Sequence, residues 1–294
     1  MVDVTQHGSD IKRVSFLENI ERSSPIGYYM AIAVMILLPG LHIAINSFNL
    51  IPEDSVMMVF YGDLLGITAT LIFLIGSLLG LLKSMNLKIR DGMYLFFISS
   101  LSFFVAEIIW AAYYFLMNVE VPYPSAADVF YIFGSIALVG AILLVTRGLK
   151  VKPGVNIFVL LLVVVSAVAV VAIYTLLTDA LSEGITTATI LDLAYPVLDV
   201  ICLVLIINLL TVSFGRGVLE AQIILTLGVV IMCISDIYFS ISTALGTYSS
   251  GSLIDTLFAV SYILMAISVS RYVDLTRFDI LMDRISKISG RKNA

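Results

Sequence analysis

Long apolar segments alternate with short polar joints along the whole chain. A bilayer core about 30 Å thick needs roughly 20 apolar residues in helical conformation, and segment after segment has the length to provide them. Hydropathy therefore predicts eight transmembrane helices, at 26–46, 56–82, 93–117, 126–147, 155–178, 190–213, 219–244 and 252–271.

Apart from Lys12, Arg13 and Arg22 in the N-terminal segment, the basic residues occur only after alternate predicted helices. They follow the second, fourth, sixth and eighth predicted helices and include Lys83, Lys88, Arg90, Arg147, Lys150, Lys152, Arg216 and Arg271. The joints after the other four helices contain no Lys or Arg. Because basic joints stay inside, the pattern predicts a multi-pass protein of the cell membrane with both termini in the cytoplasm.

Composition agrees with an all-α polytopic membrane protein, since 60% of the residues are hydrophobic and 13% are charged. Four parts are predicted: a cytoplasmic amphipathic N-terminal segment at 1–25, two four-helix transmembrane halves at 26–148 and 153–271, and a cytoplasmic amphipathic tail at 272–294. Apolar tail residues recur at helical spacing: Leu275, Phe278, Leu281, Ile285 and Ile288. This spacing suits either a stalk that continues the last helix or a helix lying on the membrane surface.

Acidic residues indicate an internal repeat. In each half an acid lies near the end of one helix and another lies at the start of the next, as with Glu107 and Asp128 and again with Asp236 and Asp255. Asp63 and Asp199 extend the match. The chain is therefore predicted to hold two four-helix repeats of the same orientation.

The predicted topology places these six acids, with Asp192, in the outer half of the membrane. A carboxylate at the membrane centre costs on the order of 2.5 to 3.5 kcal/mol, and no predicted helix supplies a basic partner. Water, shared protons, hydroxyl donors or a bound cation must therefore balance the acids. At helical spacing they share faces with Trp110, Tyr114, Tyr131, Tyr195 and Tyr262.

Carboxylates and aromatic rings together suit a cationic or amphiphilic small molecule, so these residues are predicted to line an outward pocket. The alternative is that the acids form hydrogen bonds between helices and that the rings belong to an ordinary interfacial belt. The shallow Asp192, Tyr123 and Tyr248 suit that alternative best.

The sequence predicts no metal site and no cofactor. Cys202 and Cys233 lie within apolar segments and are predicted to be core residues, and His42 is predicted to be an interfacial residue. No phosphate-binding glycine loop or catalytic serine motif occurs, and nothing indicates nucleic-acid binding. Paired carboxylates could still perform acid/base chemistry, so enzymatic activity stays open.

Three segments resemble a known class of membrane module. They are PYPSAADVFYIFGS at 122–135, AYPVLDVICLVL at 194–205, and the pattern near Asp236 and Tyr248. Over roughly 95–272 the chain is similar to the membrane-embedded N-terminal input regions of prokaryotic sensory proteins, where such helices precede diguanylate cyclase, phosphodiesterase or histidine kinase domains. No such output signature follows here, since the sequence ends about 22 residues after the last helix. The resemblance implies a stand-alone relative that signals through a partner, or a shared membrane module with another activity.

Three functions follow from these patterns. The first is a sensory or ligand-binding module that signals to a cytoplasmic protein. The second is a transporter or proton-coupled carrier, and the third is an intramembrane lipid-modifying enzyme that uses paired carboxylates. The sequence leaves the oligomeric state open.

Overall fold

The computed structural model describes residues 25–52, 55–84, 87–119, 121–148 and 186–292. This part of the chain is all helical, as predicted. The helices are α2 (Pro25–Ser47), α3 (Val56–Lys83), α4 (Arg90–Phe115), α5 (Ala126–Gly148), α7 (Thr187–Ser213), α8 (Leu219–Ala244) and α9 (Leu253–Lys292). The predicted helix at 155–178 and the segment at 1–24 lie outside the described residues.

Six of the described helices, α3, α4, α5, α7, α8 and α9, are long and apolar enough to cross a membrane. Each overlaps a span predicted from hydropathy, so the prediction of a multi-pass helical architecture is confirmed for these six. The chain divides into two compact units, at 1–41 and 42–294, and all six helices belong to the second.

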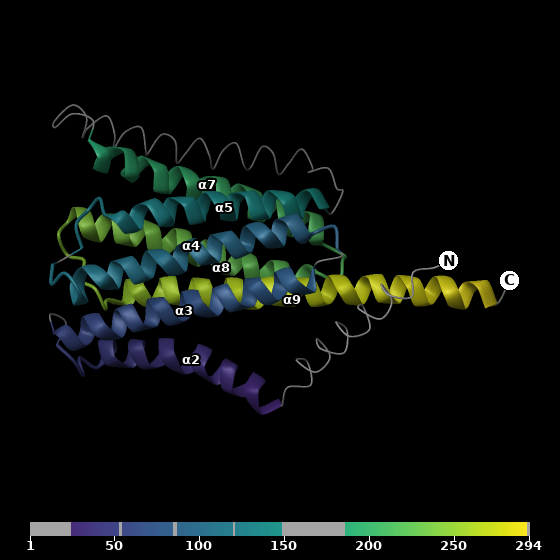
Figure 1. Cartoon of the computed structure of the whole chain (residues 1–294), viewed down its shortest axis with the longest axis horizontal. Coiled ribbons are helices and arrows are strands. Elements are labelled where there is room, and N and C mark those ends of the chain that lie inside the picture. The colour runs from purple at the N-terminus through teal and green to yellow at the C-terminus, as the bar shows by residue number, and fades with distance from the viewer. Residues whose placement is uncertain (1–24, 53–54, 85–86, 120, 149–185, 293–294) are drawn as a thin grey trace. The chain divides into compact units, whose positions relative to one another are not determined.

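Contacts between neighbouring helices close these six into a ring. Going around it, α3 packs on α4, α4 on α5, α5 on α7, α7 on α8, α8 on α9, and α9 returns to α3 (Figure 1). Short joints make α4 antiparallel to α3 and α5, and they make α8 antiparallel to α7 and α9. Helices α3, α5, α7 and α9 therefore begin at one end of the ring, here called the acidic end, and α4 and α8 begin at the other, the basic end.

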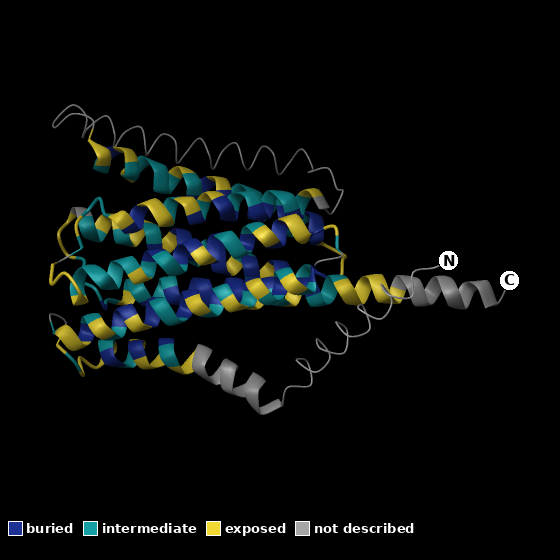
Figure 2. Cartoon of the chain, in the orientation of Figure 1, coloured by how far each residue is buried: buried dark blue, intermediate teal, exposed yellow. Residues whose placement is uncertain are grey.

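Burial separates two faces of each ring helix (Figure 2). Inward residues such as Phe73, Phe96 and Leu138 are fully enclosed, whereas large apolar residues such as Ile75 and Leu227 are about half exposed. Exposed apolar side chains of this number would be unfavourable in water, but they suit a surface covered by lipid tails.

Helix α9 is the longest, with 40 residues, and it runs past the basic end of the ring (Figure 1). Its residues 272–292, which follow the end of the span predicted from hydropathy, are called the stalk here. The tail is therefore a continuation of the last helix and not a separate surface helix. Lys83 of α3 holds the base of the stalk through an ion pair with Asp274 at 2.9 Å.

Candidate functional site

Helices α3, α4 and α9 bring three acids together at the acidic end, Asp63, Glu107 and Asp255, here called the acid cluster. Two glycines one turn apart on α3 make this approach feasible. A Cβ at Gly66 would overlap the Glu107 carboxyl group, and one at Gly62 would lie 3.1 Å from Asp255 Oδ2. A side chain at Gly66 would displace the Glu107 carboxyl group, and one at Gly62 would collide with the Gly251 backbone at 2.6 Å, next to Asp255.

Two of these acids have defined hydrogen-bond donors. Tyr131 of α5 donates to Glu107 Oε1 at 3.1 Å. Asp255 accepts from the Tyr248 hydroxyl at 3.0 Å and from the Gly251 backbone N–H at 2.6 Å. Burial, with the neighbouring Asp255 carboxyl, raises the pKa of Tyr248 well above its usual range, so this phenol stays a donor.

The third acid has no such donor. Asp63 is 7% exposed, and its buried Oδ2 has no hydrogen-bond partner among the described residues. An unpaired buried acceptor costs about 1 to 3 kcal/mol, and more for a charged group. Asp63 therefore marks the point in the acid cluster where a proton or a bound cation would bring the largest gain.

His42, predicted to be an interfacial residue, lies near the same end and packs against α9. Only 2% of it is exposed, and its Nδ1 lies 2.7 Å from Thr256 Oγ1 of α9. Asn46, one turn later in α2, donates to the Gly251 carbonyl oxygen at 3.2 Å. These bonds fasten the end of α2 to the first turn of α9.

A second pair of acids, Asp199 of α7 and Asp236 of α8, lies close together where α7 packs on α8. Two carboxyl groups this close repel each other when both are ionised. The Cys233 thiol donates to the Asp199 carbonyl oxygen at 3.8 Å. Cys202 and Cys233 are free and buried, as predicted for core residues.

Asp128 acts as a helix cap at the start of α5. Its Oδ2 accepts from the Ser125 backbone N–H at 2.7 Å, which is the carboxylate half of a capping box. Its Oδ1 accepts from the Tyr195 hydroxyl of α7 at 2.8 Å. Asp255 has the same two kinds of partner, a backbone N–H and a tyrosine hydroxyl, at the start of α9.

Asp192 forms an exposed pair at the acidic end. It accepts from the Tyr123 hydroxyl at 2.5 Å. Tyr123 lies in the joint between α4 and α5, where burial and this hydrogen bond raise the pKa of its phenol above the usual range. The contact agrees with the interpretation of these two residues as shallow, partly solvated groups.

Trp110 packs against two aromatic rings, Phe239 of α8 and Tyr248 of the joint that follows α8. Its ring centre lies 6.0 Å from that of Phe239 and 6.3 Å from that of Tyr248, in edge-to-face geometry. The Phe239 and Tyr248 centres are 4.8 Å apart. Tyr114 packs instead against Phe115 at 5.1 Å. The rings near Asp255 are thus Trp110, Phe239 and Tyr248, called the aromatic group below.

A layer of aromatic rings fills the ring of helices next to the acids, on the side toward the basic end. Tyr262 stacks on Phe73 with centres 6.5 Å apart and tilts against Phe103 at 5.3 Å. Phe103 also meets Tyr131 at 6.5 Å. Because these rings come from α3, α4, α5 and α9, they separate the acid cluster from the basic end.

The residues predicted to line one pocket therefore belong to several separate contacts in the structure. Tyr131, predicted to share a face with Asp128, donates to Glu107, and Tyr195, predicted beside Asp199, donates to Asp128. Sequence reasoning did not single out Gly62, Gly66 or Phe239. Two glycines four residues apart in an apolar helix are a known signal for close contact between helices, so Gly62 and Gly66 could have been predicted from the sequence.

No group of three His, Cys, Asp or Glu side chains within the described ranges is placed to hold a metal ion. The acid cluster combines carboxyl groups, phenol donors and a neighbouring aromatic group. Such an arrangement can take up protons or accept an organic ammonium group through hydrogen bonds and cation–π contact.

Comparisons of the chain with protein-family models, with curated proteins and with solved structures gave no match.

Proposed function

We propose that this chain is a membrane sensory or ligand-binding module, with the acid cluster as its binding site and α9 as its connection to a cytoplasmic signalling protein. The course of α9 carries the proposal. Its first turn supplies Asp255 to the acid cluster, and the same helix continues to Lys292. At 1.5 Å per residue it is about 60 Å long, so a ligand that moves Asp255 acts directly on the stalk.

The proposed orientation follows the charges. The acidic end faces outward and the basic end faces the cytoplasm, and both termini lie on the cytoplasmic side of the cell membrane. Residues at the basic end include Lys83, Lys88, Arg90, Arg147, Arg216 and Arg271. Eight transmembrane helices are proposed in all, including 26–46 and 155–178, which complete the alternation of basic and non-basic joints.

The proposal includes two repeats of the same orientation. In the ring α3, α4 and α5 are followed by α7, α8 and α9, so a two-fold operation would exchange the two sets. The capping acids support this operation, because Asp128 of α5 and Asp255 of α9 each accept a backbone N–H and a tyrosine hydroxyl. Repeats of this kind place binding sites at their interface.

The proposed ligand is a cationic or amphiphilic small molecule. Both ion pairs of the described residues lie at the basic end, namely Lys83–Asp274 and Arg271–Glu220. Within the part of the chain that the structure describes, no basic side chain pairs with the acid cluster, and Asp63 keeps an unpaired oxygen. The aromatic group beside Asp255 would favour an alkylammonium head over a small, strongly hydrated metal ion.

A displacement of α9 would act on neighbouring residues at the basic end, because α9 contacts α8 and the joint before it there. Asp279 of the stalk lies against Gly217, where a Cβ would come within 2.6 Å of the Asp279 carboxylate. Arg271 meets Glu220 of α8 at 3.4 Å. A rotation or shift of α9 would break these contacts and change the surface offered to a partner.

The acid pair favours a second candidate, an intramembrane lipid-modifying enzyme. Asp199 and Asp236 lie close together, and two neighbouring carboxyl groups are what general acid/base chemistry of this kind requires. The transporter alternative has less support, because Phe73, Phe103 and Tyr262 fill the ring between the acid cluster and the basic end.

Binding of tetramethylammonium to the purified chain tests the proposed site. The ion should raise the unfolding temperature of the wild type in detergent, because a ligand of the folded state stabilises it by mass action. Glu107→Gln should abolish this shift. Glu220→Gln, at the basic end, should retain it. An equal shift in Glu107→Gln, or none in the wild type, would contradict the proposed site.

A further inference from the structure

The stalk carries large apolar side chains on its surface. Phe278, Leu281 and Met282 are 58%, 55% and 49% exposed. They lie beyond the ring, because Asp274, one turn before Phe278, already pairs with Lys83, the last residue of α3 (Figure 1). Charged residues lie between them along the stalk, so lipid is not a suitable cover. An exposed apolar patch of this kind is typical of a surface that binds another protein.

The apolar residues of the stalk follow a heptad repeat. Phe278, Leu281, Ile285 and Ile288 are spaced by three, four and three residues, which are the a and d positions of a coiled coil. The same spacing continues back into the ring at Leu264, Ile267, Arg271 and Asp274, and none of these four is buried. The a and d positions from Leu264 to Ile288 are called the seam here.

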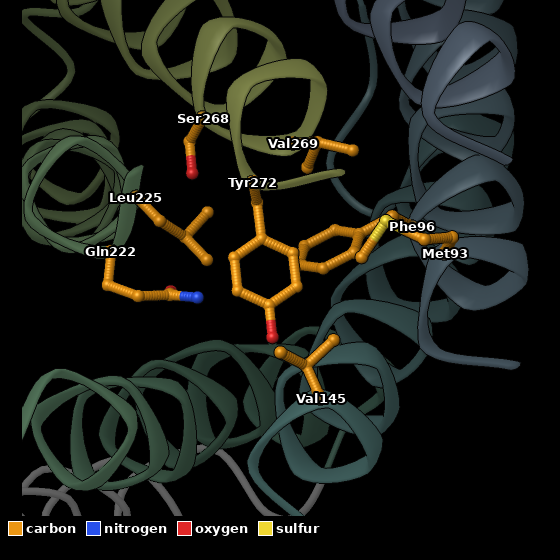
Figure 3. Close-up of a pocket in the computed structure, with 8 residues that line it drawn as sticks. All are labelled: Met93, Phe96, Val145, Gln222, Leu225, Ser268, Val269 and Tyr272. Carbon is orange, nitrogen blue, oxygen red and sulfur yellow. The ribbon is translucent and has the colours of Figure 1, made fainter. Parts of the chain in front are cut away.

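The opposite side of α9 holds this helix in the ring. Tyr272, at a b position, is 3% exposed, and Figure 3 shows it pointing into the bundle toward Phe96 and Val145. Asp279, also at a b position, lies against Gly217 in the joint before α8. The seam therefore faces away from the chain's own ring of helices.

We propose that the stalk binds the stalk of a second copy of this chain through the seam, as a parallel two-stranded coiled coil that begins at Phe278. Two copies in one membrane have the same orientation and the same depth, so identical seam residues meet about a two-fold axis. Arg271 and Asp274 lie outside the coiled coil, since they already pair with Glu220 and Lys83. This inference concerns the stalk and holds whether or not the acid cluster binds a ligand.

Two features compensate for the short length of this coiled coil. Isolated helices of fewer than about 12 to 15 residues are marginal in water, but the stalk continues a helix that is already formed, so it has no nucleation cost. Anchoring in one membrane also raises the effective concentration of each stalk for the other. At the flank of the seam, Arg277 at g would lie opposite Met282 at e of the second copy, so no like charges oppose each other there.

Disulfide crosslinking in isolated membranes tests the proposal. Leu281→Cys places a thiol at d, where two copies face each other, and Ile280→Cys places one at c, on the outer surface. Leu281 and Ile280 are neighbours and are 55% and 40% exposed, and the native Cys202 and Cys233 are buried. With copper phenanthroline as the oxidant, Leu281→Cys should form the linked dimer several-fold faster than Ile280→Cys. Equal rates, or linkage of Leu281→Cys to a different protein, would overturn the proposal.

A charge placed in the seam gives a second test in the Leu281→Cys background. Phe278→Asp would bring two carboxylates together in the coiled coil, so it should lower the crosslinking rate several-fold. Ile280→Asp adds the same charge outside the seam and should leave the rate unchanged. The same rate in both variants would overturn the proposal, because the thiols would then meet by collision and not through the seam.

Discussion

Gly66 of α3 lies directly against the carboxyl group of Glu107 of α4, in the space that a side chain would occupy. Gly66→Ala should therefore displace the acid and lower the free energy of unfolding by about 1 to 3 kcal/mol, the usual cost of overpacking. Unfolding midpoints in detergent would measure this. Gly40→Ala is the control, because a Cβ there meets nothing within 4 Å.

The same contact predicts a specific rescue. In a Glu107→Ala background the added Cβ at Gly66 has room, so Gly66→Ala should cost much less there than in the wild type. Equal costs in the two backgrounds would mean that Gly66 and Glu107 do not touch.

The Tyr131 hydroxyl should contribute measurably to stability. Tyr131→Phe removes the donor to Glu107 at 3.1 Å and leaves a buried acceptor, at a cost of about 1 to 3 kcal/mol. Tyr238→Phe is the matched control, since Tyr238 is 57% exposed. Similar unfolding midpoints for the two variants would contradict the hydrogen bond.

Alkaline pH should reveal the hydrogen bond from Tyr248 to Asp255. The pKa of Tyr248 is raised in the folded chain, so its contribution to stability is present below the unfolded pKa of about 10 and is lost as pH rises beyond it. The wild type should therefore lose more stability between about pH 9 and pH 11 than Tyr248→Phe does. Parallel pH profiles of unfolding temperature would contradict the raised pKa.

Cysteine labelling in intact cells should establish the orientation. Ser47 and Lys88 are exposed at opposite ends of the bundle, and the native Cys202 and Cys233 are buried and should react little. A membrane-impermeant thiol reagent should label Ser47→Cys from outside and leave Lys88→Cys unlabelled until the membrane is opened. Labelling of Lys88→Cys from outside would invert the proposed topology.

Hydropathy predicted the described helices well because lipid imposes a simple rule on length and polarity. Each of the six membrane-length helices overlaps its predicted span, and the periodic tail residues do continue the last helix. Periodicity also placed Tyr131 and Tyr262 on inward faces.

Contacts between helices were harder to predict. They depend on which helices are neighbours and on how each helix is rotated about its axis, and hydropathy gives neither. The sequence pattern assigned all six acids to one outward pocket. The structure groups Glu107 with Asp63 and Asp255, since α4 packs on α3 and not on α7. The burial of His42 could not be predicted either, because its partner Thr256 lies 214 residues later in the chain.

The central claim is that the acid cluster controls the stalk. Spin labels would be attached at Lys88→Cys, in the joint before α4, and at Arg277→Cys, on the stalk. The distance between the two labels, measured by pulsed electron–electron double resonance in nanodiscs, would report the position of α9. Both residues are exposed. A second pair at Lys88→Cys and Arg216→Cys, in two joints of the basic end, is the control.

Saturating tetramethylammonium should shift the distance distribution between Lys88→Cys and Arg277→Cys, leave the control pair unchanged, and have no effect in a Glu107→Gln background. An unchanged distribution with the ligand bound, or the same shift in Glu107→Gln, would contradict control of the stalk by the acid cluster.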